Sequence, residues 1–116
     1  MKVLFSTLVA ASLSAAVAAW TAPAPTLDYV VTFDKNFHPD TLEIKIGDTV
    51  IWKNFDSESH QIIAELSPFL PQEEDRFESG EIPTGGQYQH TFTRAGVCKY
   101  YSRFHPEMSG KVLISR

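Results

Sequence analysis

The chain has 116 residues, 43% of them hydrophobic, with ten Lys and Arg against fourteen Asp and Glu. Nucleic-acid-binding domains carry a basic patch, so nucleic acid is not an expected partner of this acidic chain. A single cysteine cannot form a disulfide within the chain, so a hydrophobic core or a bound ligand must supply the stability. The length allows one domain with one core.

Residues 1–18 predict an export signal that is removed. Lys2 gives the segment a positive start, residues 3–17 are apolar with small residues among them, and residues 16–18 read Ala-Val-Ala, the A-x-A pattern of a cleavage site. The stretch is shorter than the about 20 apolar residues of a membrane span, and no second apolar block follows it. We therefore expect a periplasmic or secreted protein with no membrane span after processing. Its mature chain has nine Lys and Arg against fourteen Asp and Glu, a net charge of −5.

The remaining sequence predicts β-strands in a single domain over residues 27–116, preceded by a flexible lead at residues 19–26. Alternating apolar and polar residues, many of them β-branched or aromatic, are typical of strands buried on one face. In chain order these strands are LDYVVTF (27–33), TLEIKIG (41–47), TVIWKNF (49–55), HQIIAEL (60–66), QYQHTFTRAG (87–96), VCKYYSR (97–103) and GKVLIS (110–115).

The connections between these strands favour an all-β sandwich. Gly47 and Asp48 separate the second strand from the third and predict a hairpin turn. Prolines and charges gather over residues 65–80, which favours a long crossover or one short helical turn. No long amphipathic helix is predicted after the leader. We expect an antiparallel sandwich of about seven or eight strands.

Three potential metal ligands are predicted to meet at one end of this sandwich. His60 begins a strand after the loop NFDSES, while His105 and Met108 lie between the last two strands. Loops at one end of a sandwich cluster together, which would bring two imidazoles and a thioether close to one another. His38 and His90 have no such companions, and we interpret them as surface or core histidines.

Two motifs carry a resemblance to a known family. They are N-x-D-x3-H at Asn54, Asp56 and His60, and H-x2-M-x-G-x-V at His105, Met108, Gly110 and Val112. With their surroundings over about residues 27–116, they resemble the cupredoxins, nearest the amicyanin, pseudoazurin and plastocyanin group. The resemblance implies a Greek-key β-sandwich whose copper ion is held by two His, a Cys and a weak axial Met.

The sequence departs from that family at the cysteine ligand. The family places this Cys three positions before the second His, where this chain has Ser102, and Cys98 falls where an aromatic residue usually lies. Cys98 shares a strand face with Ser102, but four residues at about 3.3 Å each put it roughly 13 Å away. Only a four-residue slip of the strand could make Cys98 a ligand. Burial is the commonest state of such a cysteine, and pairing with another chain stays open.

The resemblance and the missing thiolate together suggest a copper-binding protein. We expect His60, His105 and Met108 to hold copper, with Ser102 as a weak ligand or none. Two imidazoles and a soft thioether favour Cu(I) over Cu(II), and Zn(II) could occupy the two histidines with water. The leading interpretation is copper carriage, buffering or delivery, with a periplasmic copper donor or acceptor as partner.

Two alternatives stay open. One is a one-electron carrier of the blue-copper type with a periplasmic redox partner, and the other is a metal-free interaction domain. An enzyme is not predicted, because no nucleophile is paired with a base at a recognisable spacing.

Overall fold

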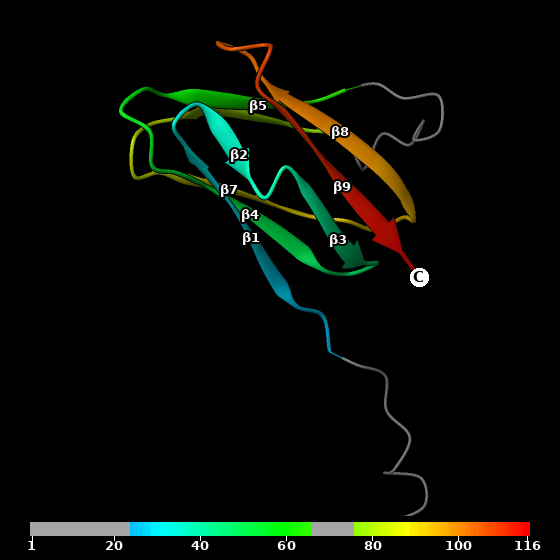
Figure 1. Cartoon of the computed structure of the whole chain (residues 1–116). Helices are drawn as coiled ribbons and strands as arrows, with labels where there is room; N and C mark the ends of the chain where they lie inside the picture. Colours follow the sequence, from blue (N-terminus) through cyan, green and yellow to red (C-terminus); the bar gives the residue numbers. More distant parts are fainter. Residues whose placement is uncertain (1–23, 66–75) are drawn as a thin grey trace, which may run out of the picture.

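Nine strands form two sheets that pack face to face in the computed structural model, which describes residues 24–65 and 76–116 (Figure 1). The strands are β1 (Leu27–Phe33), β2 (Asn36–His38), β3 (Thr41–Lys45), β4 (Thr49–Asn54), β5 (His60–Ala64), β6 (Glu78–Ile82), β7 (Gln87–Thr91), β8 (Gly96–Ser102) and β9 (Ser109–Ser115). One sheet has the order β2-β1-β4-β7 and the other the order β3-β9-β8-β5-β6. The predicted all-β sandwich is confirmed. The predicted leader and most of the lead lie outside the described residues.

The alternation of the sequence decides which side chains enter the core. On β8, Cys98, Tyr100 and Ser102 are buried, while Val97 before them and Lys99 between them are exposed. Tyr100 meets the opposite sheet, where Trp52 of β4 is fully buried with its ring 5.3 Å from that of Tyr100. Burial of a large apolar side chain stabilises the fold by roughly 1.5–3 kcal/mol, so this aromatic centre is a main source of stability.

The strand pairing is mixed rather than wholly antiparallel. β1 runs parallel to β4, and β3 runs parallel to β9, while the other pairs are antiparallel. The predicted hairpin at Gly47 and Asp48 is therefore wrong, because β3 and β4 belong to different sheets. The Asp48 carboxylate accepts the backbone N–H groups of Thr26 and Lys45 at 2.9 and 3.0 Å. These bonds fold the turn so that β4 crosses to the other sheet.

Two short strands were not predicted. β2 follows a two-residue turn in which Asp34 and Lys35 have φ angles of 55° and 57°. Positive φ at both central residues is the geometry of a tight hairpin turn, and it is usually signalled by Asn-Gly or Asp-Gly. β6 lies partly within the stretch for which a crossover or helical turn was expected. Residues 66–75 of that stretch lie outside the described residues.

Four connections meet at one end of the sandwich. The β1–β2, β4–β5 and β6–β7 turns lie at the left of Figure 1. The Gly85 N–H donates to the Asn54 carbonyl at 2.7 Å, which joins the last two of them. The β8–β9 connection carries His105, whose imidazole bonds to Glu58 of the β4–β5 loop. Across the described ranges, no helix is long and apolar enough to span a bilayer.

Candidate metal centre

Asn54 fixes the loop that precedes His60. Its amide nitrogen donates to the carbonyl oxygens of Glu58 at 2.8 Å and Ile82 at 2.9 Å. Its amide oxygen accepts the Thr32 hydroxyl at 2.8 Å and the Asp56 N–H at 2.9 Å. Both donors and both acceptor positions of the buried amide are therefore used, which explains why an Asn suits the first position of the N-x-D-x3-H motif.

Asp56 holds the imidazole of His60 in one orientation. The carboxylate oxygen Oδ2 lies 2.7 Å from Nε2 of His60, and both residues are buried. A carboxylate accepts hydrogen bonds, so Nε2 carries the proton and donates it, and Nδ1 is left as the basic nitrogen. Carboxylate–histidine pairs of this kind orient imidazoles that bind metals and raise their basicity. Asp56 and His60 of the N-x-D-x3-H motif therefore form one hydrogen-bonded unit.

Ser102 faces the basic nitrogen of His60. Its hydroxyl oxygen lies 2.9 Å from Nδ1, and both side chains have an exposed fraction of 0%. Since Nδ1 is the acceptor, the hydroxyl donates. The pairing of Ile62 with Ser102 between β5 and β8 sets this approach. The sequence resemblance suggested Ser102 for the position of the family's cysteine, and the structure places this side chain against His60.

The turn after β8 presents His105 and Met108. The Ser102 carbonyl accepts the His105 N–H at 3.2 Å, and the His105 carbonyl accepts the Met108 N–H at 2.8 Å. The imidazole rings of His60 and His105 are 5.7 Å apart between centroids. Met108 is buried, with 3% of its surface exposed, and its carbonyl accepts the Ser102 N–H at 3.0 Å. His60, Ser102, His105 and Met108 are thus connected in one small region.

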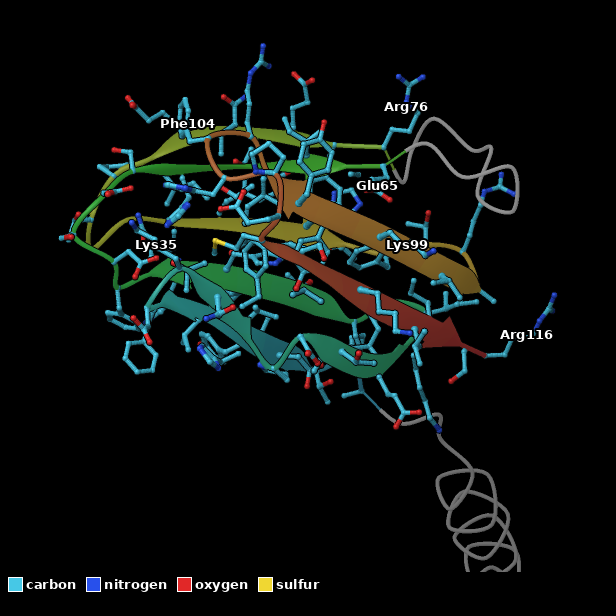
Figure 2. The ribbon with its side chains drawn as sticks, turned by 45° about the horizontal axis from the view of Figure 1, so that its top comes forward. Lys35, Glu65, Arg76, Lys99, Phe104 and Arg116 are labelled. Carbon is cyan, nitrogen blue, oxygen red and sulfur yellow. The ribbon has the colours of Figure 1, made fainter. Side chains whose placement is uncertain are left out.

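Glu58 contacts the second histidine. Its Oε2 lies 2.7 Å from Nε2 of His105, and its Oε1 lies 3.6 Å from Nζ of Lys35. The hydrogen bond to His105, and secondarily the charge of Lys35, hold the pKa of the Glu58 carboxyl below its ordinary value. Figure 2 shows Lys35 and Phe104, the neighbour of His105, toward the same end of the sandwich, with Arg116 toward the other end. No sequence pattern singled out Glu58, because acidic loop residues are ordinarily solvated.

Cys98 lies farther along β8 from His60 than Ser102 does. It pairs with Val112 on β9, four residues along β8 from Ser102, and it is 2% exposed. Four residues of strand span about 13 Å, far beyond the reach of a metal–sulfur bond. The expected burial of Cys98 is confirmed.

The remaining histidines lie on other strands. Nε2 of His38 on β2 lies 3.2 Å from the Phe33 carbonyl oxygen, at the surface. The ring of His90 on β7 stacks on Phe77 with 4.7 Å between centroids. Both placements agree with the interpretation of these two residues as surface and core histidines.

The side chains present suit copper better than metals that need several carboxylates or thiolates. No cluster of three or more His, Cys, Asp and Glu side chains able to hold a metal occurs among residues 24–65 and 76–116. The candidate set instead consists of two imidazoles, the Met108 thioether and the Ser102 hydroxyl. Imidazole nitrogen with thioether sulfur is a donor combination that copper accepts in either oxidation state. The residues present therefore fit a copper ion.

The same contacts reveal a pairing that sequence spacing did not show. Ser102, His60 and Asp56 are hydrogen-bonded in series, as a hydroxyl nucleophile, its base and an orienting acid would be. Hydrolysis would require Ser102 to reach a substrate, but Ser102 and His60 are both 0% exposed. The series therefore orients the imidazole rather than presenting a nucleophile.

Comparison with known proteins identifies the family. The sequence profile described as "Copper binding proteins, plastocyanin/azurin family" matches residues 29–115. The chain belongs to this copper-binding family. The resemblance to cupredoxins that the motifs indicated is thereby confirmed, and copper is the metal that the plastocyanin/azurin family supports.

Solved structures agree with this family. A purple cupredoxin from Nitrosopumilus maritimus is 32% identical, with a TM-score of 0.65, and the match covers 76% of this chain and 99% of that one. A reduced Cu(I) form of an amicyanin variant is 28% identical, with a TM-score of 0.67 and coverages of 84% and 89%. A copper-containing nitrite reductase from Thermus scotoductus is 26% identical over 83% of this chain but 23% of its own length, with a TM-score of 0.69.

Proposed function

We propose that this plastocyanin/azurin-family chain binds copper through His60, His105 and Met108, and that it carries, buffers or delivers the ion. The observation that carries the proposal is the Ser102 hydroxyl at Nδ1 of His60, where the family places a thiolate. Copper bound by the remaining groups lacks the strong thiolate bond that distinguishes blue-copper sites. Binding without efficient electron exchange is the function that suits such a site.

The orientation of the two histidines supports this assignment. The Nε2 atom of each imidazole is hydrogen-bonded to a carboxylate, that of Asp56 for His60 and that of Glu58 for His105. Each ring therefore keeps Nδ1 as its basic nitrogen, and Nδ1 is the atom proposed to bind copper. On His60 a bound ion would replace the hydrogen bond from Ser102.

The donor set favours the reduced ion. Cu(I) accepts three ligands and a soft thioether, whereas Cu(II) prefers a tetragonal arrangement with additional nitrogen or oxygen donors. The candidate residues are buried apart from His105, whose side chain is 23% exposed, so water has little access to complete a Cu(II) sphere. We therefore propose Cu(I) as the cargo, exchanged at the His105 side with a periplasmic donor or acceptor.

Electron carriage is the second candidate. Membership of the family favours it, and the relatives include a purple cupredoxin. It would require a fourth ligand that stabilises Cu(II), and the separation of Cys98 from Ser102 by four residues of strand, about 13 Å, argues against that residue. We also propose that residues 1–18 are an export leader and that the protein is periplasmic or secreted. Its role in this proposal is binding rather than catalysis.

Copper titration of the protein tests the proposal. Cu(I) and Cu(II) are added separately, and the visible spectrum and melting temperature are recorded for the unaltered chain and for variants His60→Ala, His105→Ala and Met108→Ala. Tight Cu(I) binding without intense colour, raised melting temperature and weaker binding in all three variants is the expected result, because a ligand bound only by the folded state stabilises it. An intense Cu(II) band would favour the electron carrier. No binding of either ion would leave a metal-free interaction domain.

A further inference from the structure

Glu58 contacts His105 in a way that an ordinary surface acid would not. The carboxylate lies 2.7 Å from Nε2, although its side chain is 48% exposed and free to point into solvent. The backbone beneath it is fixed, because the Glu58 carbonyl accepts the buried Asn54 amide at 2.8 Å. The amide that shapes the His60 loop thus fixes the backbone of Glu58 within reach of the imidazole.

Lys35 contacts both carboxylates that hold the histidines. Its backbone N–H donates to the two carboxylate oxygens of Asp56, each at 3.2 Å, and its Nζ lies 3.6 Å from Glu58. Lys35 and Asp34 both have left-handed φ angles, a conformation that costs energy in residues other than Gly. The β1–β2 turn therefore directs one backbone donor and one ammonium group at the loop that carries His60.

We propose that Glu58 is a positioning residue for His105. By accepting the Nε2 proton it fixes the ring and leaves Nδ1 to the copper ion, as Asp56 does for His60. One five-residue segment, Asp56 to His60, therefore supplies the first ligand and the carboxylates that orient both histidines. This inference rests on the proposed copper site.

A simple surface ion pair is the competing explanation. Exposed pairs contribute about 0–1 kcal/mol and are screened by salt, so they would matter little for the site. Glu107 offers a matched comparison, since its carboxylate lies 3.6 Å from Nδ1 of the same imidazole and its side chain is 74% exposed. A general charge effect would make Glu58 and Glu107 equivalent, whereas positioning requires the specific bond at Nε2.

The first experiment uses the copper-free full chain and needs no metal. The 15N and 1H NMR signals of the imidazoles are recorded at a pH where His105 is neutral. The expected result is an Nε2–H signal of His105 protected from solvent exchange, lost in Glu58→Ala, retained in Glu58→Gln through its amide oxygen and retained in Glu107→Ala. The protected signal of His60 in the same spectra shows that each variant is folded. Persistence of the His105 signal in Glu58→Ala would overturn the proposal.

The second experiment measures transfer of Cu(I) from each variant to a competing chelator. Loss of a group that orients a metal ligand typically weakens binding by about 10–100-fold, so Glu58→Ala is expected to lose at least about 10-fold in affinity while Glu107→Ala loses much less. Equal losses in the two variants would mean a general charge effect and would overturn the positioning role. If the unaltered chain binds no copper, the proposed function fails, and the imidazole spectra still report separately whether Glu58 orients His105.

Discussion

Ser102 places its hydroxyl oxygen 2.9 Å from Nδ1 of His60, across 42 residues of sequence, with both side chains fully buried. The contact depends on the register of β8 against β5, in which Ser102 pairs with Ile62. A slip of four residues would be needed to put Cys98 in the same place. The register thus places a hydroxyl beside His60, and in the proposed site this hydroxyl takes the place of the family's sulfur.

Replacement of Asn54 by Ala is expected to destabilise the protein by about 3 kcal/mol. The change would leave the Asp56 N–H and the carbonyl groups of Glu58 and Ile82 without the Asn54 side chain, and buried unsatisfied groups cost about 1–3 kcal/mol each before water enters. Chemical denaturation measures the effect. Asn36→Ala is the control, since the exposed Asn36 makes one bond, to the Asp34 carbonyl, and a change within about 0.5 kcal/mol is expected. Similar losses in the two variants would contradict the role of Asn54.

Replacement of Cys98 by Ala is expected to leave copper affinity unchanged. Cys98 is 2% exposed and pairs with Val112 in the interior of the sheet, so its loss creates only a small cavity costing about 1 kcal/mol. Competition with a Cu(I) chelator measures the affinity, and denaturation measures the stability. A large drop in affinity at unchanged stability would show that Cys98 reaches the ion.

Gly110 has no room for a side chain. A Cβ at this position would overlap the hydroxyl and ring of Tyr100, its partner on β8. Tyr100 is fully buried against Trp52 and Phe37 and cannot move aside, so Gly110→Ala is expected to cost about 1–3 kcal/mol. Thermal unfolding checks this value against Ser109→Ala, an exposed change on the same strand. Equal melting temperatures for the two variants would mean that the Tyr100 ring gives way.

Asp48 is expected to make the folding stability of the protein depend on pH. Hydrogen bonds from the N–H groups of Thr26 and Lys45 lower the pKa of its carboxyl from the ordinary 3.8. A carboxyl whose pKa is lower in the folded state stabilises the fold fully above 3.8, and this contribution is lost as the pH falls through the folded-state pKa.

The Asp48→Asn variant tests this dependence. It is expected to be less stable than the unaltered chain at pH 7, because an amide cannot accept both N–H groups, and the difference should shrink as the pH falls below the ordinary pKa of 3.8. Denaturation curves taken between neutral and strongly acidic pH give the comparison. A difference that stays constant over that range would refute the role assigned to the ionised carboxylate.

Much of the fold could be predicted because alternation on long strands is a local signal. β1 has the predicted bounds, and β8 differs by one residue at each end. β2 could not be predicted, since its turn uses Asp34 and Lys35 without a Gly. The turn at Asp48 was mistaken for a hairpin because local sequence shows that the chain reverses, whereas the sheet that receives β4 depends on distant pairing.

The candidate site was only partly predictable. The spacing of His60, His105 and Met108 suggested the ligand set, and the structure brings the two imidazoles together. The bond between Glu58 and His105 joins two loops 47 residues apart, and no local pattern signals it. Such contacts depend on how the loops are held, and Asn54 and Lys35 supply that support.

The measurement that tests the central claim most directly is the visible spectrum of the Ser102→Cys variant with Cu(II), compared with the unaltered chain. If Ser102 occupies the place of the family's thiolate beside His60, the variant becomes intensely coloured through a copper–thiolate bond, while the unaltered chain with Cu(II) stays pale. A variant that binds Cu(II) and remains pale, or an unaltered chain that is already intensely coloured, would contradict the account.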